Sequence, residues 1–181
     1  HIRAAVGSEV AQSNCHPFRH RNRLFQHNGA IGGFPRIKRR LDMLIDERLY
    51  AAKVGQTDSE TMFLLALTFG LEADPFTGIQ RMIEEVERAR EAESIDEPFR
   101  MTVATTDGQS ICAARYASYG SQPSLYHSTA DATLKGPDDA RLEIPEGGFL
   151  VLSEPLDDLA ENWIEVPSGS RLEIRNGKAV V

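Results

Sequence analysis

Residues 57–69 read TDSETMFLLALTF and carry the strongest structural signal in the chain. The first four have the spacing of a capping box, in which Thr57 and Glu60 bond the free N–H groups at a helix start. An almost continuous apolar run from Met62 to Phe69 follows. A helix that is apolar on nearly all sides is buried in a core, and Gly70 is placed to end it. We therefore predict a central, buried helix over this stretch.

The sequence on either side predicts two further helices. One runs from Pro35 to about Leu49, with proline in the first turn, where it is favoured. The other begins at Asp74 and Pro75, an N-cap and a first-turn proline, and runs to about Ala92. Each has one face that is mainly apolar, formed by Ile37, Leu41, Leu44, Ile45 and Arg48 in the first and by Ile79, Met82, Ile83 and Val86 in the second.

Strand signals lie on both sides of the helical region. Residues 1–34 are rich in His, Asn, Gly and Pro and predict short strands joined by loops. After Ser94, the dipeptides Asp107-Gly108 and Asn176-Gly177 each predict a hairpin. The later predicted strands are Phe99–Thr106, Gln109–Ser118, Gly148–Ser153, Trp163–Val166, Arg171–Arg175 and Lys178–Val181. This order indicates a single α+β domain over residues 1–181, with helices packed on an antiparallel sheet. A second sheet would have to come mostly from elsewhere.

The composition argues against several classes of protein. A chain of 181 residues is long enough for one domain with a proper core and short for two. It has no apolar run of about 18 residues, so we expect no membrane span. Only two cysteines, Cys15 and Cys112, are present, which favours a reducing cytoplasm over a disulfide framework. The net charge of -7 argues against general nucleic-acid binding. Residues 10–40 are basic and lack Asp and Glu, which we interpret as a solvated surface or a site for small anions.

Four residues together suggest a site for an amino acid. An α-amino acid ligand is a zwitterion and needs one fixed cation and one fixed anion. Arg3 can bind a carboxylate through two parallel hydrogen bonds, and Asp58 can bind an ammonium group. The side-chain amide of Asn28 and the backbone N–H of Gly29 make a plausible oxyanion hole. Taken singly, each has a simpler reading: a surface ion pair, a helix start and a tight turn. Their joint occurrence points to amide chemistry on an amino-acid side chain.

The order of these motifs resembles that of class II glutamine amidotransferases, members of the N-terminal nucleophile hydrolase superfamily. The family pattern is His-x-Arg, a His-Pro segment, His-Asn-Gly, and an acidic helix start. The chain has His1-Ile2-Arg3, His16-Pro17-Phe18, His27-Asn28-Gly29 and Asp58-Ser59-Glu60 in that order. Later stretches resemble a stand-alone branch that includes relatives of ergothioneine-pathway and glutathione-degrading γ-glutamyl hydrolases. These are Ala114-Arg115-Tyr116, Pro123-Ser124-Leu125-Tyr126, Ser153-Glu154-Pro155-Leu156, Trp163 and Val166-Pro167.

The resemblance implies a fold and a set of roles. The fold would be a four-layer αββα sandwich with its active site at one edge of the two sheets. Arg3 would bind the α-carboxylate of glutamine or of a γ-glutamyl compound, and Asp58 would bind its α-ammonium. Asn28 and Gly29 would form the oxyanion hole. The ligand would be a small molecule, and neither a metal nor an organic cofactor is implied.

The chain departs from the family at the nucleophile. In this family a cysteine at the very N-terminus attacks the amide, and its own α-amine helps to activate the thiol. The chain begins at His1, so we expect several tens of upstream residues to be absent, with the first strands of the sandwich. Cys15 lies in the His-Pro segment and Cys112 in a predicted strand, so neither matches the nucleophile. We expect residues 1–181 alone to be catalytically inactive.

Three other interpretations remain open. Cys15 with His20 or His27 would form a thiol hydrolase, whereas Cys15 and His16 point apart on an extended segment. His16 and His20 have the spacing of metal ligands, provided that the segment is helical. Finally, the domain could bind an amino acid without turning it over, or be an inactive fragment.

Overall fold

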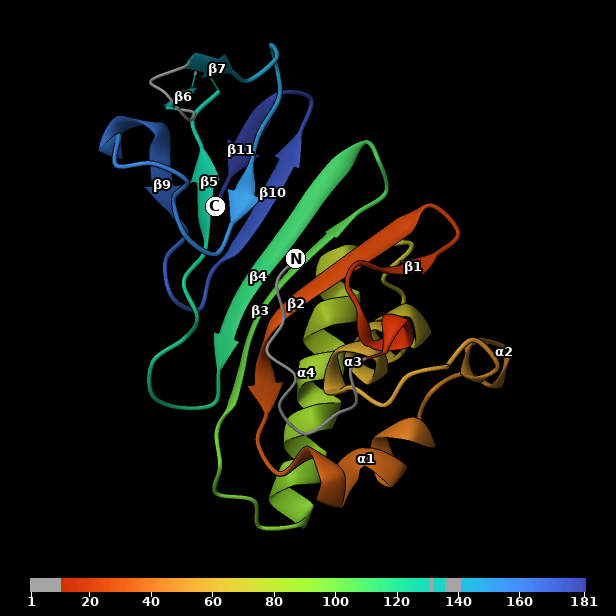
Figure 1. The fold of residues 1–181 in the computed structure, drawn as a ribbon. Helices are drawn as coiled ribbons and strands as arrows, with labels where there is room; N and C mark the ends of the chain where they lie inside the picture. The colour runs from red at the N-terminus through yellow and green to blue at the C-terminus, as the bar shows by residue number, and fades with distance from the viewer. Residues whose placement is uncertain (1–10, 131, 136–140) are drawn as a thin grey trace.

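The computed structural model describes residues 11–130, 132–135 and 141–181. Its centre is a six-stranded antiparallel sheet in the order β1-β2-β3-β4-β10-β11. The helices cover one face of this sheet, and smaller sheets lie on its other side toward one end (Figure 1). The strands of the large sheet are β1 (Phe18–His20), β2 (Arg23–Ile31), β3 (Phe99–Thr106), β4 (Ser110–Ala117), β10 (Arg171–Arg175) and β11 (Lys178–Val180).

The helical layer is built around α3, as the sequence predicts. Every residue of α3 (Asp58–Thr68) from Ser59 to Leu67 is buried, and the ring of Phe63 stacks on Phe25 of β2 with the centroids 5.2 Å apart. The helix ends before Gly70, whose φ of 101° lies in the left-handed region that glycine tolerates. Helix α4 (Pro75–Ala92) begins at the predicted N-cap, Asp74, whose carboxylate accepts two backbone hydrogen bonds. Both helix predictions are confirmed.

The prediction of a single helix from Pro35 to Leu49 is wrong. The chain forms α1 (Phe34–Asp42), leaves the helix, and restarts as α2 (Glu47–Tyr50). Asp46 causes the restart, because its carboxylate caps α2 by accepting from the N–H of Arg48, at 2.8 Å. The N–H of Asp46 in turn donates to the hydroxyl of Thr68 at the end of α3. The apolar periodicity continues across the break, which hides it in the sequence.

Both predicted hairpins are confirmed, as β3–β4 and β10–β11. Between them the chain forms a second, smaller sheet in the order β8-β5-β9, whose strands are β5 (Tyr126–Ser128), β8 (Val151–Leu152) and β9 (Trp163–Glu165). A separate apolar cluster that includes Leu125, Val166 and Leu172 joins this part of the chain to the large sheet. A further pair, β6 (Thr133–Lys135) and β7 (Arg141–Glu143), is not predicted by the sequence. Short 3-10 turns lie at Gln12–Asn14 and Ala160–Asn162.

The observed fold is thus α+β, with antiparallel sheets and a helical layer, as predicted. Strand β2 is longer than the short strands expected in residues 1–34, since it pairs with β3 from Leu24 to Ile31. In the part of the chain that the structure describes, no helix is long and apolar enough to cross a membrane.

Candidate functional site

Strand β2 presents its two faces to different surroundings. Phe25, His27 and Ile31 are buried, whereas Gln26 and Asn28 are exposed. The exposed side faces a cavity of about 420 Å³ between the large sheet and the small one. Gln26, His27, Asn28, Thr102, Ala104, Leu125, Val151, Leu152 and Ser153 line this cavity. The amide of Asn28 therefore stands where a small molecule can reach it.

Gly29 has a backbone conformation that other residues rarely adopt. Its φ is 135°, although β2 stays paired with β3 through this position. A Cβ added here would lie 2.1 Å from the carbonyl oxygen of Arg100 and 3.0 Å from the Cα of Met101. Glycine is thus required for two reasons, the positive φ and the close approach of β3. Strand β2 passes Arg100 at a distance that no side chain would permit.

Asp58 lies at the first turn of α3, directly beside the end of β2. Its Oδ2 accepts a hydrogen bond from the backbone N–H of Ile31 at 3.0 Å, and its Oδ1 accepts from the N–H of Ser59 at 2.8 Å. The carboxylate is only half-buried, and each oxygen keeps further acceptor capacity. The helix N-terminus also stabilises a negative charge here. Asp58 is therefore a fixed anion beside the strand that carries Asn28 and Gly29.

A second contact joins the same two elements. The Nδ1 atom of His27 lies 2.8 Å from the hydroxyl oxygen of Ser59. The imidazole is buried, and burial lowers the pKa of His27 below its ordinary value of 6.5, against the opposing effects of Asp58 and of the Arg100 backbone. The ring is consequently held in its neutral form near pH 7. From the sequence, Ser59 has no predicted role of its own, and His27 has one only as an alternative partner of Cys15.

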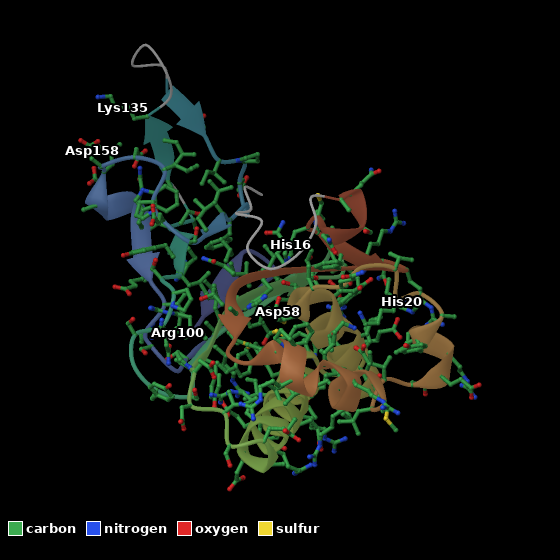
Figure 2. The ribbon with its side chains drawn as sticks, turned by 60° about the horizontal axis from the view of Figure 1, so that its bottom comes forward. His16, His20, Asp58, Arg100, Lys135 and Asp158 are labelled. Carbon is green, nitrogen blue, oxygen red and sulfur yellow. The ribbon has the colours of Figure 1, made fainter. Side chains whose placement is uncertain are left out.

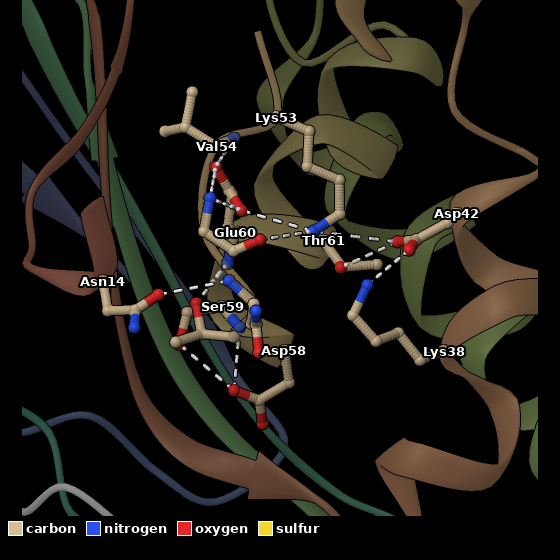
Figure 3. A network of polar contacts seen from close by, with 12 residues as sticks. Asn14, Lys38, Asp42, Lys53, Val54, Asp58, Ser59, Glu60 and Thr61 are labelled. Atoms are coloured by element: carbon tan, nitrogen blue, oxygen red, sulfur yellow. Dashed lines mark hydrogen bonds and ion pairs between the residues drawn. The ribbon is translucent and has the colours of Figure 1, made fainter. Parts of the chain in front are cut away.

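A buried charge network holds the loop that leads into α3. The carboxylate of Glu60 accepts hydrogen bonds from the N–H groups of Val54 and Gly55 at 2.8 to 3.0 Å. Lys53 lies 3.3 Å from Glu60 and 3.9 Å from Asp42, whose other oxygen pairs with Lys38. Figure 3 shows the Lys53 amine between the carboxylates of Glu60 and Asp42, with Lys38 on the other side of Asp42 and Asp58 below them.

This network changes the predicted capping box in one detail. Thr57 caps the N–H of Glu60 at 3.2 Å, as expected. The Glu60 side chain, however, accepts from Val54 and Gly55, because the preceding loop folds back over the helix start. The side chain of Asn14 also accepts from the N–H of Gln56, at 3.1 Å. Glu60 and Asn14 therefore hold the loop that precedes α3, and Asp58 itself is held by its bonds to the N–H groups of Ile31 and Ser59.

The remaining predicted positions do not join this group. Arg3 lies outside the described residues. Cys15 is exposed, and its thiol contacts the carbonyl of Ala11 at 3.5 Å. Among the described contacts, the thiol of Cys15 meets neither His20 nor His27, so the Cys15 hydrolase interpretation gains no support. Cys112 is buried, and burial raises the pKa of its thiol to about 11.

The metal interpretation gains no support from the described part of the chain. His16 precedes strand β1 and His20 ends it, so the segment between them is not the helix that this interpretation required. No cluster of three or more His, Cys, Asp or Glu residues suited to a metal occurs within residues 11–130, 132–135 and 141–181. Figure 2 shows Asp58 near the middle of the molecule, away from His20. Lys135 and Asp158 lie farther off, in the part of the molecule that holds the small sheets.

The arrangement offers an anion, an exposed amide and a closely packed glycine within one short region. Asp58 meets β2 at Ile31, two residues beyond Gly29, and Ser59 meets it at His27, two residues before Gly29. An ammonium group can bind to such a carboxylate, and amide or backbone donors can stabilise a developing oxyanion.

Comparison with known proteins places the chain in a family. The family model described as "Glutamine amidotransferases class-II" matches residues 1–181. The probable glutamine amidotransferase DUG3 of Saccharomyces cerevisiae is 29% identical over 199 residues, which cover 97% of this chain and 56% of that protein. The chain thus spans little more than half the length of this relative.

Two solved structures have the same fold. A glutamine aminotransferase class-II domain protein from Silicibacter pomeroyi has a TM-score of 0.77 and 36% identity, over 94% of this chain and 70% of that one. A predicted glutamine amidotransferase from Pseudomonas aeruginosa has a TM-score of 0.55 and 21% identity, over 95% of this chain and 66% of that one. At that identity, the second likeness concerns the fold alone. The α+β antiparallel architecture, the order of the motifs and the match over residues 1–181 agree: the chain belongs to the class II glutamine amidotransferase family.

Proposed function

We propose that this chain binds L-glutamine or a γ-glutamyl compound and supports hydrolysis of its side-chain amide. The observation that carries the proposal is the pairing of Asp58 with strand β2, through the 3.0 Å bond to the N–H of Ile31. This bond holds a half-buried carboxylate beside the strand of Asn28 and Gly29. In the proposal, Asp58 receives the α-ammonium group of the substrate, and Arg3 receives its α-carboxylate.

Asn28 and Gly29 take the role of the oxyanion hole. When a nucleophile attacks the side-chain carbonyl, its oxygen becomes negatively charged and needs preorganised donors. Asn28 is exposed beside the cavity of about 420 Å³, and the Gly29 backbone is fixed by its contact with Arg100. Removing one such donor typically costs about 10²–10³ in kcat.

The nucleophile in the proposal is an N-terminal cysteine, as in the family that the chain resembles. Cys112 is a poor candidate, because its buried thiol has a pKa raised to about 11 and would carry little thiolate near pH 7. Cys15 has no imidazole among its described contacts. A γ-glutamyl substrate would leave an amine in place of ammonia, and the cavity beside Asn28 would hold that leaving group. A cytoplasmic location stays a prediction from the two free cysteines.

The test measures hydrolysis of L-glutamine by the full-length natural protein and by two aspartate variants. Asp58→Asn removes the proposed ammonium partner, whereas Asp74→Asn is a matched control at the N-terminus of α4. Loss of a charge-assisted hydrogen bond of about 1.5–3 kcal/mol predicts a rise in KM of roughly 10- to 150-fold for Asp58→Asn alone.

N-acetyl-L-glutamine, which has no ammonium group, sharpens the test. The wild-type protein should hydrolyse it poorly. Asp58→Asn should slow hydrolysis of L-glutamine far more than hydrolysis of the acetylated compound. Equal effects of the two aspartate variants on KM would contradict the proposed role of Asp58. Thermal stabilisation by glutamine without release of glutamate would instead mark a binding domain without turnover.

A further inference from the structure

The residues that flank the proposed oxyanion hole are fastened to helix α3 at two points. On one side, the Nδ1 atom of His27 lies 2.8 Å from the Ser59 hydroxyl. On the other side, the N–H of Ile31 donates to Oδ2 of Asp58 at 3.0 Å. Asn28, Gly29 and Ala30 lie between these two contacts. Both partners in α3 are consecutive residues, so any shift of the helix start would move both ends of this short segment.

The His27 contact is well sheltered from water. The exposed fraction is 4% for His27 and 6% for Ser59. A buried hydrogen bond between side chains holds its geometry well, because a broken bond leaves two polar groups without solvent. The Ser59 hydroxyl also lies 3.4 Å from Oδ1 of Asp58. One hydroxyl therefore connects the imidazole beside the oxyanion donors to the carboxylate proposed to bind the ammonium group.

The opposite side of the segment is also constrained. The carbonyl oxygen of Arg100 comes so close to Gly29 that a Cβ there would lie 2.1 Å away. Strand β3 thus blocks movement of Gly29 in one direction, and Ser59 restrains His27 from the helical side. Catalytic donors must be placed to within a fraction of an ångström, and a misplacement of about 1 Å can lower a rate roughly 100-fold.

We infer that His27 and Ser59 are positioning residues, whose hydrogen bond holds the Asn28 and Gly29 donors in a fixed orientation to Asp58. This inference rests on the proposed function. Neither side chain is assigned contact with the substrate; both act through their neighbours. Binding of the α-ammonium group and stabilisation of the oxyanion are thereby tied to one rigid unit formed by the end of β2 and the start of α3.

The first experiment measures kcat and KM for L-glutamine in the full-length protein. Ser59→Ala removes the hydroxyl and should lower kcat roughly 10- to 100-fold. KM should change by about threefold at most, because the Asp58 bonds to the N–H groups of Ile31 and Ser59 remain. Thr105→Val is the matched control, since it removes another buried hydroxyl, which donates to Leu24 of β2 at 2.8 Å. It should lower the Tm by a similar amount and leave kcat unchanged.

Conservative variants separate positioning from general stability. Ser59→Thr keeps the hydroxyl and should restore most of kcat. His27→Asn is a second conservative variant that should keep most of kcat, because its amide stands close to the place of Nδ1 and can either donate to or accept from the Ser59 hydroxyl. Full kcat in Ser59→Ala, or an equal loss in Thr105→Val at the same Tm, would overturn the inference.

A second readout does not depend on activity. In nitrogen-15 spectra, Ser59→Ala should shift the amide signals of Asn28 and Gly29 and speed their hydrogen exchange at least tenfold, whereas Thr105→Val should not. If the wild-type protein releases no glutamate while these signals respond, the proposed function fails, and the positioning role of the His27–Ser59 hydrogen bond stands. If the wild-type protein is active while Ser59→Ala alters neither kcat nor these signals, the inference fails and the proposed function stands.

Discussion

Substitution of Gly29 by alanine tests the geometry of the site at its most constrained point. A Cβ at this position would lie 2.1 Å from the Arg100 carbonyl oxygen, whereas ordinary contacts begin at 3.4 Å. Strand β2 would have to move away from β3 by about 1.3 Å to relieve the overlap. Moreover, the φ of 135° is one that alanine adopts only with strain.

The magnitude follows from these two effects. Strain at an unfavourable φ costs about 1–3 kcal/mol, and forcing an extra carbon into a packed site costs about 1–3 kcal/mol more. Gly108→Ala is the matched control, since Gly108 has a φ of 90° but no atom within 4 Å of its added Cβ. Gly108→Ala should therefore show only the cost of the unfavourable φ. At about 2–4 °C per kcal/mol, the Tm of Gly29→Ala should therefore fall roughly 2–12 °C below that of Gly108→Ala.

The effect on activity should be larger and confined to Gly29. A shift of the strand by about 1 Å moves the proposed oxyanion donors and should lower kcat for glutamine roughly 100-fold. Thermal unfolding gives the Tm, and release of glutamate by the full-length protein gives kcat. Equal losses of stability in Gly29→Ala and Gly108→Ala, with glutamine hydrolysis retained in both, would refute the close contact with Arg100 as a determinant of the site.

Three further predictions concern buried groups. Glu60→Ala should lower the free energy of unfolding by about 3–5 kcal/mol, measured by urea denaturation, because it leaves buried Lys53 with only Asp42 at 3.9 Å and removes the acceptor of the Val54 and Gly55 N–H groups; a loss below about 1 kcal/mol would contradict this contribution of Glu60. The pKa of His27 is lowered on folding, so its contribution to stability is complete above pH 6.5 and is lost as the pH falls toward the folded-state pKa. Urea denaturation at pH 7.5 and 5.5 should show this loss, with a slope of at most about 1.4 kcal/mol per pH unit; His27→Asn should remove that slope, and an unchanged slope would contradict it. Iodoacetamide at pH 8 should label exposed Cys15 and spare Cys112, whose pKa is raised to about 11; equal labelling in the folded protein would show that Cys112 is accessible.

Much of the helical layer could be predicted from local signals. The starts of α3 and α4 are marked by Thr57 and Asp74, and the structure places an N-cap at each. The break between α1 and α2 could not be predicted, because it depends on Asp46 meeting Thr68, which is 22 residues away. The apolar pattern of Ile37, Leu41 and Ile45 runs through that break, and all three are buried regardless.

The candidate site likewise combines residues that local sequence signals mark with contacts between distant residues that they do not. Asn28 and Asp58 stand out in the sequence because their residue types and motif order suit binding of an amino acid. The contact between His27 and Ser59 joins positions 32 residues apart, and no local pattern reveals such a pair. The small sheet of β5, β8 and β9 has strands of only two or three residues, too short to show a clear alternation. Its pairing is decided by packing on the large sheet.

If the family's chemistry operates here, an N-terminal cysteine attacks a glutamine bound at Asp58, Asn28 and Gly29. The most direct test uses an L-glutamine analogue whose side-chain amide is replaced by a diazomethyl ketone, which alkylates a nucleophile in the site. The full-length natural protein is treated with this compound, and the adduct is mapped by mass spectrometry. We expect one adduct on an N-terminal cysteine, prevented by excess L-glutamine and slowed in Asp58→Asn. An adduct on Cys15, or no adduct that glutamine prevents, would contradict it.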